Sequence, residues 1–204
     1  KYGADLDVIS DEDNYPFEYH AYYVGDPELL NFWLERGVDV NHNPGFSEPV
    51  LNGVVSSIVN YEGTEDKVYQ IQKLLDYGAS PNLGEHIFGN SPLHIAASKG
   101  RADIARILLD GGADPNFQNH ENETPLHKAV KEGNIELVKL LVERGADANI
   151  KDVEKLSPWS LAQNSPELRL ILEPFGLDVP DTHPTPDELI ERLVAIPRFS
   201  RAVF

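Results

Sequence analysis

The sequence contains no cysteine and no methionine. Without cysteine the chain can form no disulfide, thiolate metal site or cysteine nucleophile. Its apolar runs are far shorter than the roughly 20 residues of a membrane-spanning helix, so none is predicted. Because methionine is absent, translation did not begin at Lys1, and a removed signal peptide or a trimmed start explains this. We expect a cytoplasmic location, with a periplasmic or secreted one open if a signal peptide was removed.

Basic residues are also scarce. Lys and Arg number 17 against 34 Asp and Glu, which gives a net charge of −17. Residues 1–66 hold 14 of the acids and only two bases, Lys1 and Arg36. Such a surface repels phosphate, so we expect no nucleic-acid partner and no membrane, and instead a basic protein. The alternative is that the acidic residues only keep the protein soluble.

Motifs of catalysis and cofactor binding are missing too. The chain has no phosphate-binding P-loop, no dinucleotide glycine pattern and no His-Glu-x-x-His zinc motif. A Gly-x-Ser-x-Gly nucleophile elbow is also absent. We therefore predict no catalytic residue, no metal and no cofactor. With 41% hydrophobic and 25% charged residues, the composition is that of a globular protein with a sizeable core.

What the sequence does contain is a repeat. SPLHIAA at 91–97 recurs as TPLHKAV at 124–130 and, weakened, as SPWSLA at 157–162. The prolines Pro92, Pro125 and Pro158 are 33 residues apart both times. GGADPN at 111–116 recurs after the same interval as RGADAN at 144–149. Two blocks that share one period indicate a repeated structural unit rather than chance similarity.

The residues of each block are those expected in a pair of helices. Ser91 or Thr124 can cap a helix whose first residue is the following proline, where no N–H is needed. Gly100 and Gly133 can end that helix, and a second helix with an apolar stripe follows. This pattern resembles the ankyrin repeat. The resemblance implies an all-α ankyrin-repeat solenoid of four repeats plus a shortened fifth, with a C-terminal helix.

We place the repeats near 14–46, 47–89, 90–122, 123–155 and 156–176, after an acidic lead-in at 1–13. The second repeat contains about eight extra residues, which we expect around 60–66 as an acidic loop. Residues 177–204 read as a Pro-rich connector and a helix with an apolar face. That helix caps the last repeat, or it docks elsewhere or pairs two copies of the chain. His94 and His127 occupy the family's repeat histidine, for which the resemblance implies a bridging, structural role.

The resemblance implies protein binding through the hairpin tips and the exposed side of the first helices. Carried over by position, and with the acidic insertion added, it gives these candidate contact residues: Tyr22, Tyr23, Asn43, Phe46, Glu62, Glu65, Asp66, His86, Phe88, Ser98, Lys99, His120, Glu121, Lys131, Glu132 and Asp152.

Two functions remain open. The first is an inhibitor of one dedicated basic enzyme, as in the small bacterial ankyrin proteins that serve as immunity proteins. The second is an adaptor or regulatory subunit that binds a protein or peptide without inhibiting it. For either function we expect a monomer that forms a heterodimer with its partner.

Overall fold

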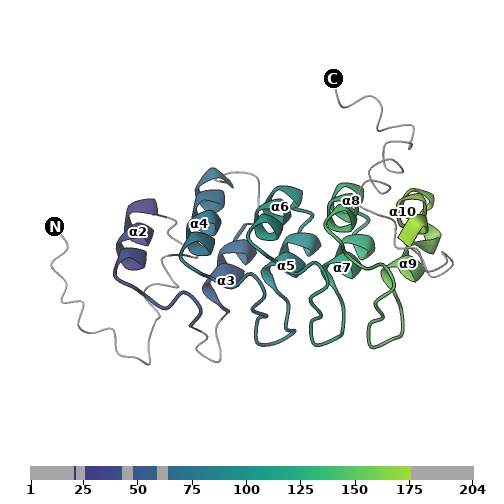
Figure 1. The fold of residues 1–204 in the computed structure, drawn as a ribbon, viewed down its shortest axis with the longest axis horizontal. Helices are drawn as coiled ribbons and strands as arrows, with labels where there is room; N and C mark the ends of the chain where they lie inside the picture. The colour runs from purple at the N-terminus through teal and green to yellow at the C-terminus, as the bar shows by residue number, and fades with distance from the viewer. Residues whose placement is uncertain (1–20, 22–25, 43–47, 59–63, 176–204) are drawn as a thin grey trace, which may run out of the picture. The chain divides into compact units, whose positions relative to one another are not determined.

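A computed structural model describes residues 21, 26–42, 48–58 and 64–175 (Figure 1). Over these residues it contains nine α-helices, two short 3-10 helices and no strand, which confirms the all-α fold class. The chain forms two compact units: unit 1 is Lys1–Ala96 with Asp103–Asp114, and unit 2 is Ala97–Ala102 with Pro115–Phe204. The predicted lead-in, connector and C-terminal helix lie outside the described residues.

Unit 1 is built around α4. It holds α2 (Pro27–Glu35), α3 (Val50–Ser56), α4 (Thr64–Asp76) and most of α5 (Pro92–Ser98) and α6 (Ala102–Asp110). Both α2 and α3 pack against α4. Its fully buried side chains include Leu51, Ile71, Leu74, Leu93, Ile104 and Leu108. These residues recur at helical spacing, so each helix buries one apolar stripe.

Unit 2 holds α7 (Pro125–Lys131), α8 (Ile135–Glu143), α9 (Pro158–Leu161) and α10 (Pro166–Leu172). Two 3-10 turns, η3 (Ala162–Asn164) and η4 (Glu173–Phe175), follow α9 and α10. Helix α7 packs against α8 and α9, and α10 packs against α8 (Figure 1). Leu126, Leu137, Leu141 and Leu172 are its largest fully buried side chains.

The helices begin where the sequence signals place them. Helices α5, α7 and α9 start at Pro92, Pro125 and Pro158. Helix α9 begins with a capping box in which Ser157 and Ser160 each accept a hydrogen bond from the other's backbone N–H. Asn134 caps α8 by accepting from Leu137 N. Side-chain acceptors thus satisfy N–H groups that would otherwise lack a helical partner.

Helix α4 starts earlier than predicted. We expected an acidic loop over 60–66, but Thr64, Glu65 and Asp66 form the first turn of this helix. Helix α4 has 13 residues, whereas α6 and α8 have 9 each, so about one extra turn of helix accounts for half of the insertion. Carboxylates in a first turn interact favourably with the positive end of the helix dipole, which explains why acidic residues there extend the helix.

Asparagine side chains tie successive hairpin bases together. In unit 1, Asn82 Nδ2 donates to Gly112 O over 3.1 Å, and Asn82 Oδ1 accepts from Asp114 N at 2.7 Å. In unit 2, Asn116 makes the same pair of bonds with Gly145 and Asp147. Each amide therefore fixes the distance between the end of one repeat and the end of the next.

Candidate protein-binding surface

Three hairpin tips are described by the structure: the first tip at 85–90, the second at 119–123 and the third at 152–156. Each tip closes with a backbone hydrogen bond from its first residue to its last. Glu85 N donates to Asn90 O over 3.0 Å in unit 1. In unit 2, Asn119 N donates to Glu123 O over 3.0 Å, and Asp152 N to Leu156 O over 2.9 Å.

The second and third tips are held by the side chain of their first residue. Asn119 Oδ1 accepts from Glu121 N at 3.0 Å and from Glu123 N at 2.9 Å. Asp152 Oδ1 accepts two equivalent bonds from Glu154 N and Leu156 N, both at 2.9 Å. Both side chains are buried. We predicted Asp152 as a contact residue; the structure gives its carboxylate a part in holding the tip itself.

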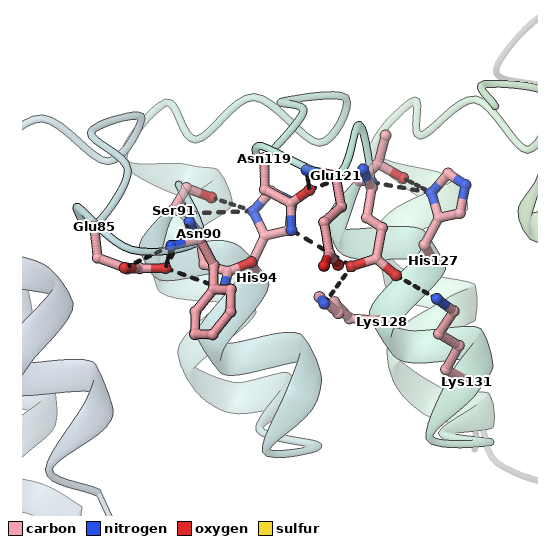
Figure 2. Close-up of polar contacts among 12 residues, drawn as sticks. Glu85, Asn90, Ser91, His94, Asn119, Glu121, His127, Lys128 and Lys131 are labelled. Atoms are coloured by element: carbon pink, nitrogen blue, oxygen red, sulfur yellow. Dashed lines mark hydrogen bonds and ion pairs between the residues drawn. The ribbon is translucent and has the colours of Figure 1, made fainter. Parts of the chain in front are cut away.

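The first tip is one residue longer, and a longer side chain holds it. Glu85 accepts from Ile87 N at 2.6 Å, from Phe88 N at 2.9 Å and from Asn90 N at 3.2 Å. Gly89 completes the turn at φ +71°, a conformation that glycine adopts without strain. Burial alone would raise the pKa of Glu85, but these backbone N–H groups and the Asn90 side chain outweigh it and lower the pKa. Figure 2 shows the Glu85 carboxylate turned towards Asn90.

The tips differ in what they expose. Ile87 and Phe88 on the first tip are 75% and 54% exposed. On the second tip His120 and Glu121 are exposed, and on the third Val153 is. His86 is exposed as well. The predicted tip residues His86, Phe88, His120 and Glu121 are therefore available to a partner.

The first-helix candidates lie at helix ends. Ser98 and Lys99 are exposed at the end of α5, and Lys131 and Glu132 are exposed at the end of α7. Lys131 also forms an ion pair with Glu123, which raises the pKa of its ammonium group. Lys131 thus already takes part in a contact within unit 2.

Glu123 was not predicted, and its pKa is strongly perturbed. It is 2% exposed, and both Lys128 and Lys131 form ion pairs with its carboxylate. Burial disfavours its charged form, but the two lysines outweigh burial and lower the pKa of Glu123 to about 2. Figure 2 labels the two lysines, and dashed lines mark their ion pairs. The sequence signal is a Glu five and eight residues before two lysines of one helix face.

His127 has the bridging role that the resemblance implied for the repeat histidines. His127 Nδ1 lies 2.9 Å from Thr124 Oγ1, and its Nε2 lies 3.2 Å from Leu156 O. In unit 1, His94 Nδ1 lies 2.8 Å from Ser91 Oγ. Both rings are fully buried, and burial lowers the pKa of His127. The neutral ring is therefore a structural element of the repeat rather than a proton donor to a ligand.

The other candidate residues fall within the residue range of unit 1. Asp66 is exposed on the first turn of α4, and Glu65 precedes it in that turn. Tyr22, Tyr23, Asn43, Phe46 and Glu62 lie outside the described residues.

The two units differ in their balance of acidic and basic residues. Among the described residues, unit 1 has twelve Asp and Glu against four Lys and Arg, whereas unit 2 has ten against nine. Most of this excess lies in the first 66 residues, because the described rest of unit 1 has five Asp and Glu against three Lys and Arg. In the part of the chain that the structure covers, no group of three His, Asp or Glu side chains could hold a metal ion. No helix in that part is long and apolar enough to cross a bilayer.

Residues 61–152 match the family model described as ankyrin repeats, in three copies. The chain thus contains ankyrin repeats, which this match recognises between α4 and the third tip. This match covers both units, and it includes the two near-complete repeats in which the sequence pattern was strongest.

The similar proteins share the repeats with this chain. The ankyrin repeat-containing protein P1E11.10 of Schizosaccharomyces pombe is 45% identical over 61 residues, covering 30% of this chain and 29% of that protein. The 2-5A-dependent ribonuclease of Mus musculus is 42% identical over 57 residues, 28% of this chain and 8% of that protein. The Notch protein of Drosophila melanogaster is 40% identical over 76 residues, 37% of this chain and 3% of that protein. This chain spans less than a third of each of these relatives, so the similarity concerns the repeat and not their other activities.

Proposed function

We propose that this chain binds one dedicated basic protein and inhibits it, in the manner of an immunity protein that neutralises a toxic enzyme. Ankyrin repeats are a protein-binding module, and residues 61–152 of this chain match three copies of them. The observation that carries the proposal is the excess of twelve acidic over four basic residues in the described part of unit 1. Complementary charge speeds encounter with a basic partner and disfavours other partners.

Inhibition would follow from covering the partner's active site. Exposed hairpin tips can lie over a cleft without supplying chemistry of their own. Unit 1 offers the acidic residues for electrostatic attraction, and the tips offer side chains for close contact. The alternative function is an adaptor that holds a basic protein or peptide away from its active site. The same acidic surface supports it, and the two differ only in the effect on the partner.

The first experiment is a pull-down from the native host with the full chain as bait, at low and at roughly physiological salt. Bound proteins are identified and quantified by mass spectrometry. We expect one basic protein at equal stoichiometry, with recovery that falls as salt screens the charges. Several unrelated partners, or a single neutral one unaffected by salt, would contradict a dedicated basic partner.

Charge variants test whether unit 1 provides the attraction. Glu35 and Asp76 are exposed last residues of α2 and α4, and lysine is well tolerated at such helix ends. Replacing both by lysine should weaken binding by about tenfold, mainly through slower association. The control changes Glu143 and Glu173, which are exposed at comparable helix ends in unit 2. Equal losses from both pairs would show that total charge, and not unit 1, sets the affinity.

An activity assay of the purified partner separates the two functions. For an inhibitor, one equivalent of this chain abolishes the partner's activity on its own substrate. For an adaptor, the activity is unchanged while the complex persists on gel filtration. This assay decides between the functions without depending on the mode of contact.

A further inference from the structure

We infer that the first tip inserts Ile87 and Phe88 as a preformed apolar anchor into an apolar pocket of the partner protein, and that basic side chains border this pocket. The inference rests on the proposed protein-binding function and names the chemistry of the partner's surface. It concerns unit 1 alone, in which all residues of the tip lie.

The anchor is distinguished by exposure. Ile87 and Phe88 are adjacent and 75% and 54% exposed, and they are large apolar side chains. At corresponding places the second tip carries His120 and Glu121, and the third carries Val153 and Glu154. The third tip also exposes Val153 (55%) and Leu156 (36%), but these two residues are not adjacent in the sequence. Among the three described tips, only the first therefore presents two adjacent large apolar side chains. An aromatic side chain that becomes buried in a partner's pocket is a common source of binding energy.

The tip is held in one conformation before any partner arrives. The Glu85 carboxylate accepts from three backbone N–H groups, at 2.6 Å for Ile87, 2.9 Å for Phe88 and 3.2 Å for Asn90. Two of these groups belong to the anchor residues themselves. Glu85 is only 7% exposed. Water therefore cannot readily replace the hydrogen bonds that its carboxylate accepts. A preorganised loop loses less conformational entropy on binding, and therefore gains affinity.

Charge identifies the surroundings of the pocket. From Gly84 to Asn90 the tip has no Lys or Arg, and the described part of unit 1 has twelve Asp and Glu against four Lys and Arg. A partner surface that approaches the anchor therefore meets a negative field. Lys or Arg at the rim of the pocket would be attracted, whereas Asp or Glu there would be repelled.

The same charge argues for a protein pocket over other apolar surroundings. An anionic lipid surface would repel the acidic unit, and two side chains alone give little membrane affinity. A second copy of this chain carries the same negative charge, with a net charge of −17. A pocket with a basic rim accommodates both the apolar tip and the acidic surroundings.

Photo-crosslinking locates the pocket. A benzoylphenylalanine is placed at position 88 of the full chain, which is irradiated in the native host extract, and the crosslinked peptide is sequenced. The anchor predicts one peptide from the partner, containing apolar residues with Lys or Arg nearby. A probe at position 153 on the third tip is the control. A crosslink to an acidic or wholly polar peptide, or equal crosslinking from the control position, would overturn the inference.

Binding of the purified partner then measures the contribution of the anchor. Ile87→Ser with Phe88→Ser should raise the Kd by about a hundredfold, whereas Val153→Ser should change it by less than about threefold. Because all three residues are exposed, these substitutions leave the fold intact, as circular dichroism and Tm should show. If the double variant binds as tightly as the wild type, the anchor is refuted while protein binding stands. If no partner is found for any variant, the proposed function fails instead.

Glu85→Gln tests whether the anchor is preorganised. Glutamine keeps the length of the side chain, but its NH₂ group cannot accept from the backbone N–H groups. We expect amide hydrogen exchange at Ile87 and Phe88 to rise by about tenfold or more, and the Kd to rise with it. Faster exchange without loss of affinity would show that Glu85 orders the tip but that this order is irrelevant to binding. Unchanged exchange would show that the carboxylate does not hold the tip.

Discussion

The buried side-chain amide of Asn52 donates a hydrogen bond to the carbonyl oxygen of Asn90 over 2.8 Å. His127 reaches Leu156 O in the same way, at 3.2 Å. Asn90 and Leu156 each stand directly before a serine that precedes the next helix. In α3 an asparagine thus takes over the bridge that a histidine makes in α7. Pro49 explains the exchange, because it offers neither the N–H nor the hydroxyl that Thr124 gives to His127 Nδ1.

A double-mutant cycle at Pro49 and Asn52 tests this dependence. Asn52→His alone should destabilise unit 1 by about 1–2 kcal/mol, because the buried Nδ1 has no donor opposite it. With Pro49→Thr also present, the hydroxyl and the N–H return, and about 1 kcal/mol of that loss should be recovered. Urea unfolding of the four proteins gives the coupling free energy. Strictly additive effects would mean that the histidine does not need the capping residue.

Gln70 is a second departure from the repeat, and we predict that it weakens the core. It is fully buried on α4, and neither its Oε1 nor its Nε2 has a hydrogen-bond partner. Ile104 and Leu137 fill the corresponding positions of α6 and α8. Gln70→Leu should therefore stabilise the protein by about 1–3 kcal/mol, since a buried amide without partners is costly. Urea unfolding measures the change.

The matched control is Gln72→Leu, two residues along the same helix at an exposed position. It should change the free energy of unfolding by less than about 0.5 kcal/mol. A loss of stability in Gln70→Leu would instead indicate that an internal water satisfies the amide in solution.

The repeat pattern predicted the helices because its residues act locally. Proline at the first helical position, a serine or threonine before it and glycine after the last turn each act on the backbone beside them. Helices α5 and α7 consequently begin at Pro92 and Pro125, and Gly112 and Gly145 follow α6 and α8 at φ +89°.

The tips were harder to predict because their contacts form only after the hairpin closes. The turns of the second and third tips use positive φ at Asn122 (56°) and Lys155 (65°), where no glycine marks the conformation. Asp152 resembles an ordinary exposed loop acid until the backbone N–H groups of Glu154 and Leu156 turn towards it. Burial of the Glu123 carboxylate likewise depends on ion pairs with Lys128 and Lys131 of the following helix. Periodicity carries no information about such contacts.

The ion pairs of Glu123 make unit 2 sensitive to acid. The pKa of Glu123 falls from an ordinary 4.5 to about 2 on folding, so the unfolded chain binds its proton first as the pH drops. The resulting stability is complete above about pH 5 and is lost as the pH falls towards 2. We expect a contribution of about 1–3 kcal/mol, smaller than the full shift implies because the Lys131 side chain is 43% exposed to solvent.

Urea unfolding between pH 6 and pH 3 compares the wild type with Glu123→Gln. The variant should be less stable at pH 6, and the difference should shrink as the pH falls. Glu121→Gln, at an exposed position two residues away, should follow the wild type at every pH. Parallel profiles for the wild type and Glu123→Gln would show that the ion pairs contribute no net stability.

Gly84 sets how closely the two sides of the first tip approach. A Cβ atom at Gly84 would lie 2.5 Å from Gly89 O and 2.8 Å from Gly89 C, closer than real Cβ atoms come to backbone. Gly84→Ala must therefore push the two sides apart and weaken the hydrogen bonds that Glu85 accepts. We expect a loss of about 1–3 kcal/mol in unfolding free energy and faster amide exchange at Ile87 and Phe88.

His86→Ala changes an exposed residue of the same tip and should alter neither quantity by much. If Gly84→Ala slowed the exchange or left it unchanged, the hairpin could widen without disturbing the tip, and the close approach would not be what keeps Ile87 and Phe88 in place.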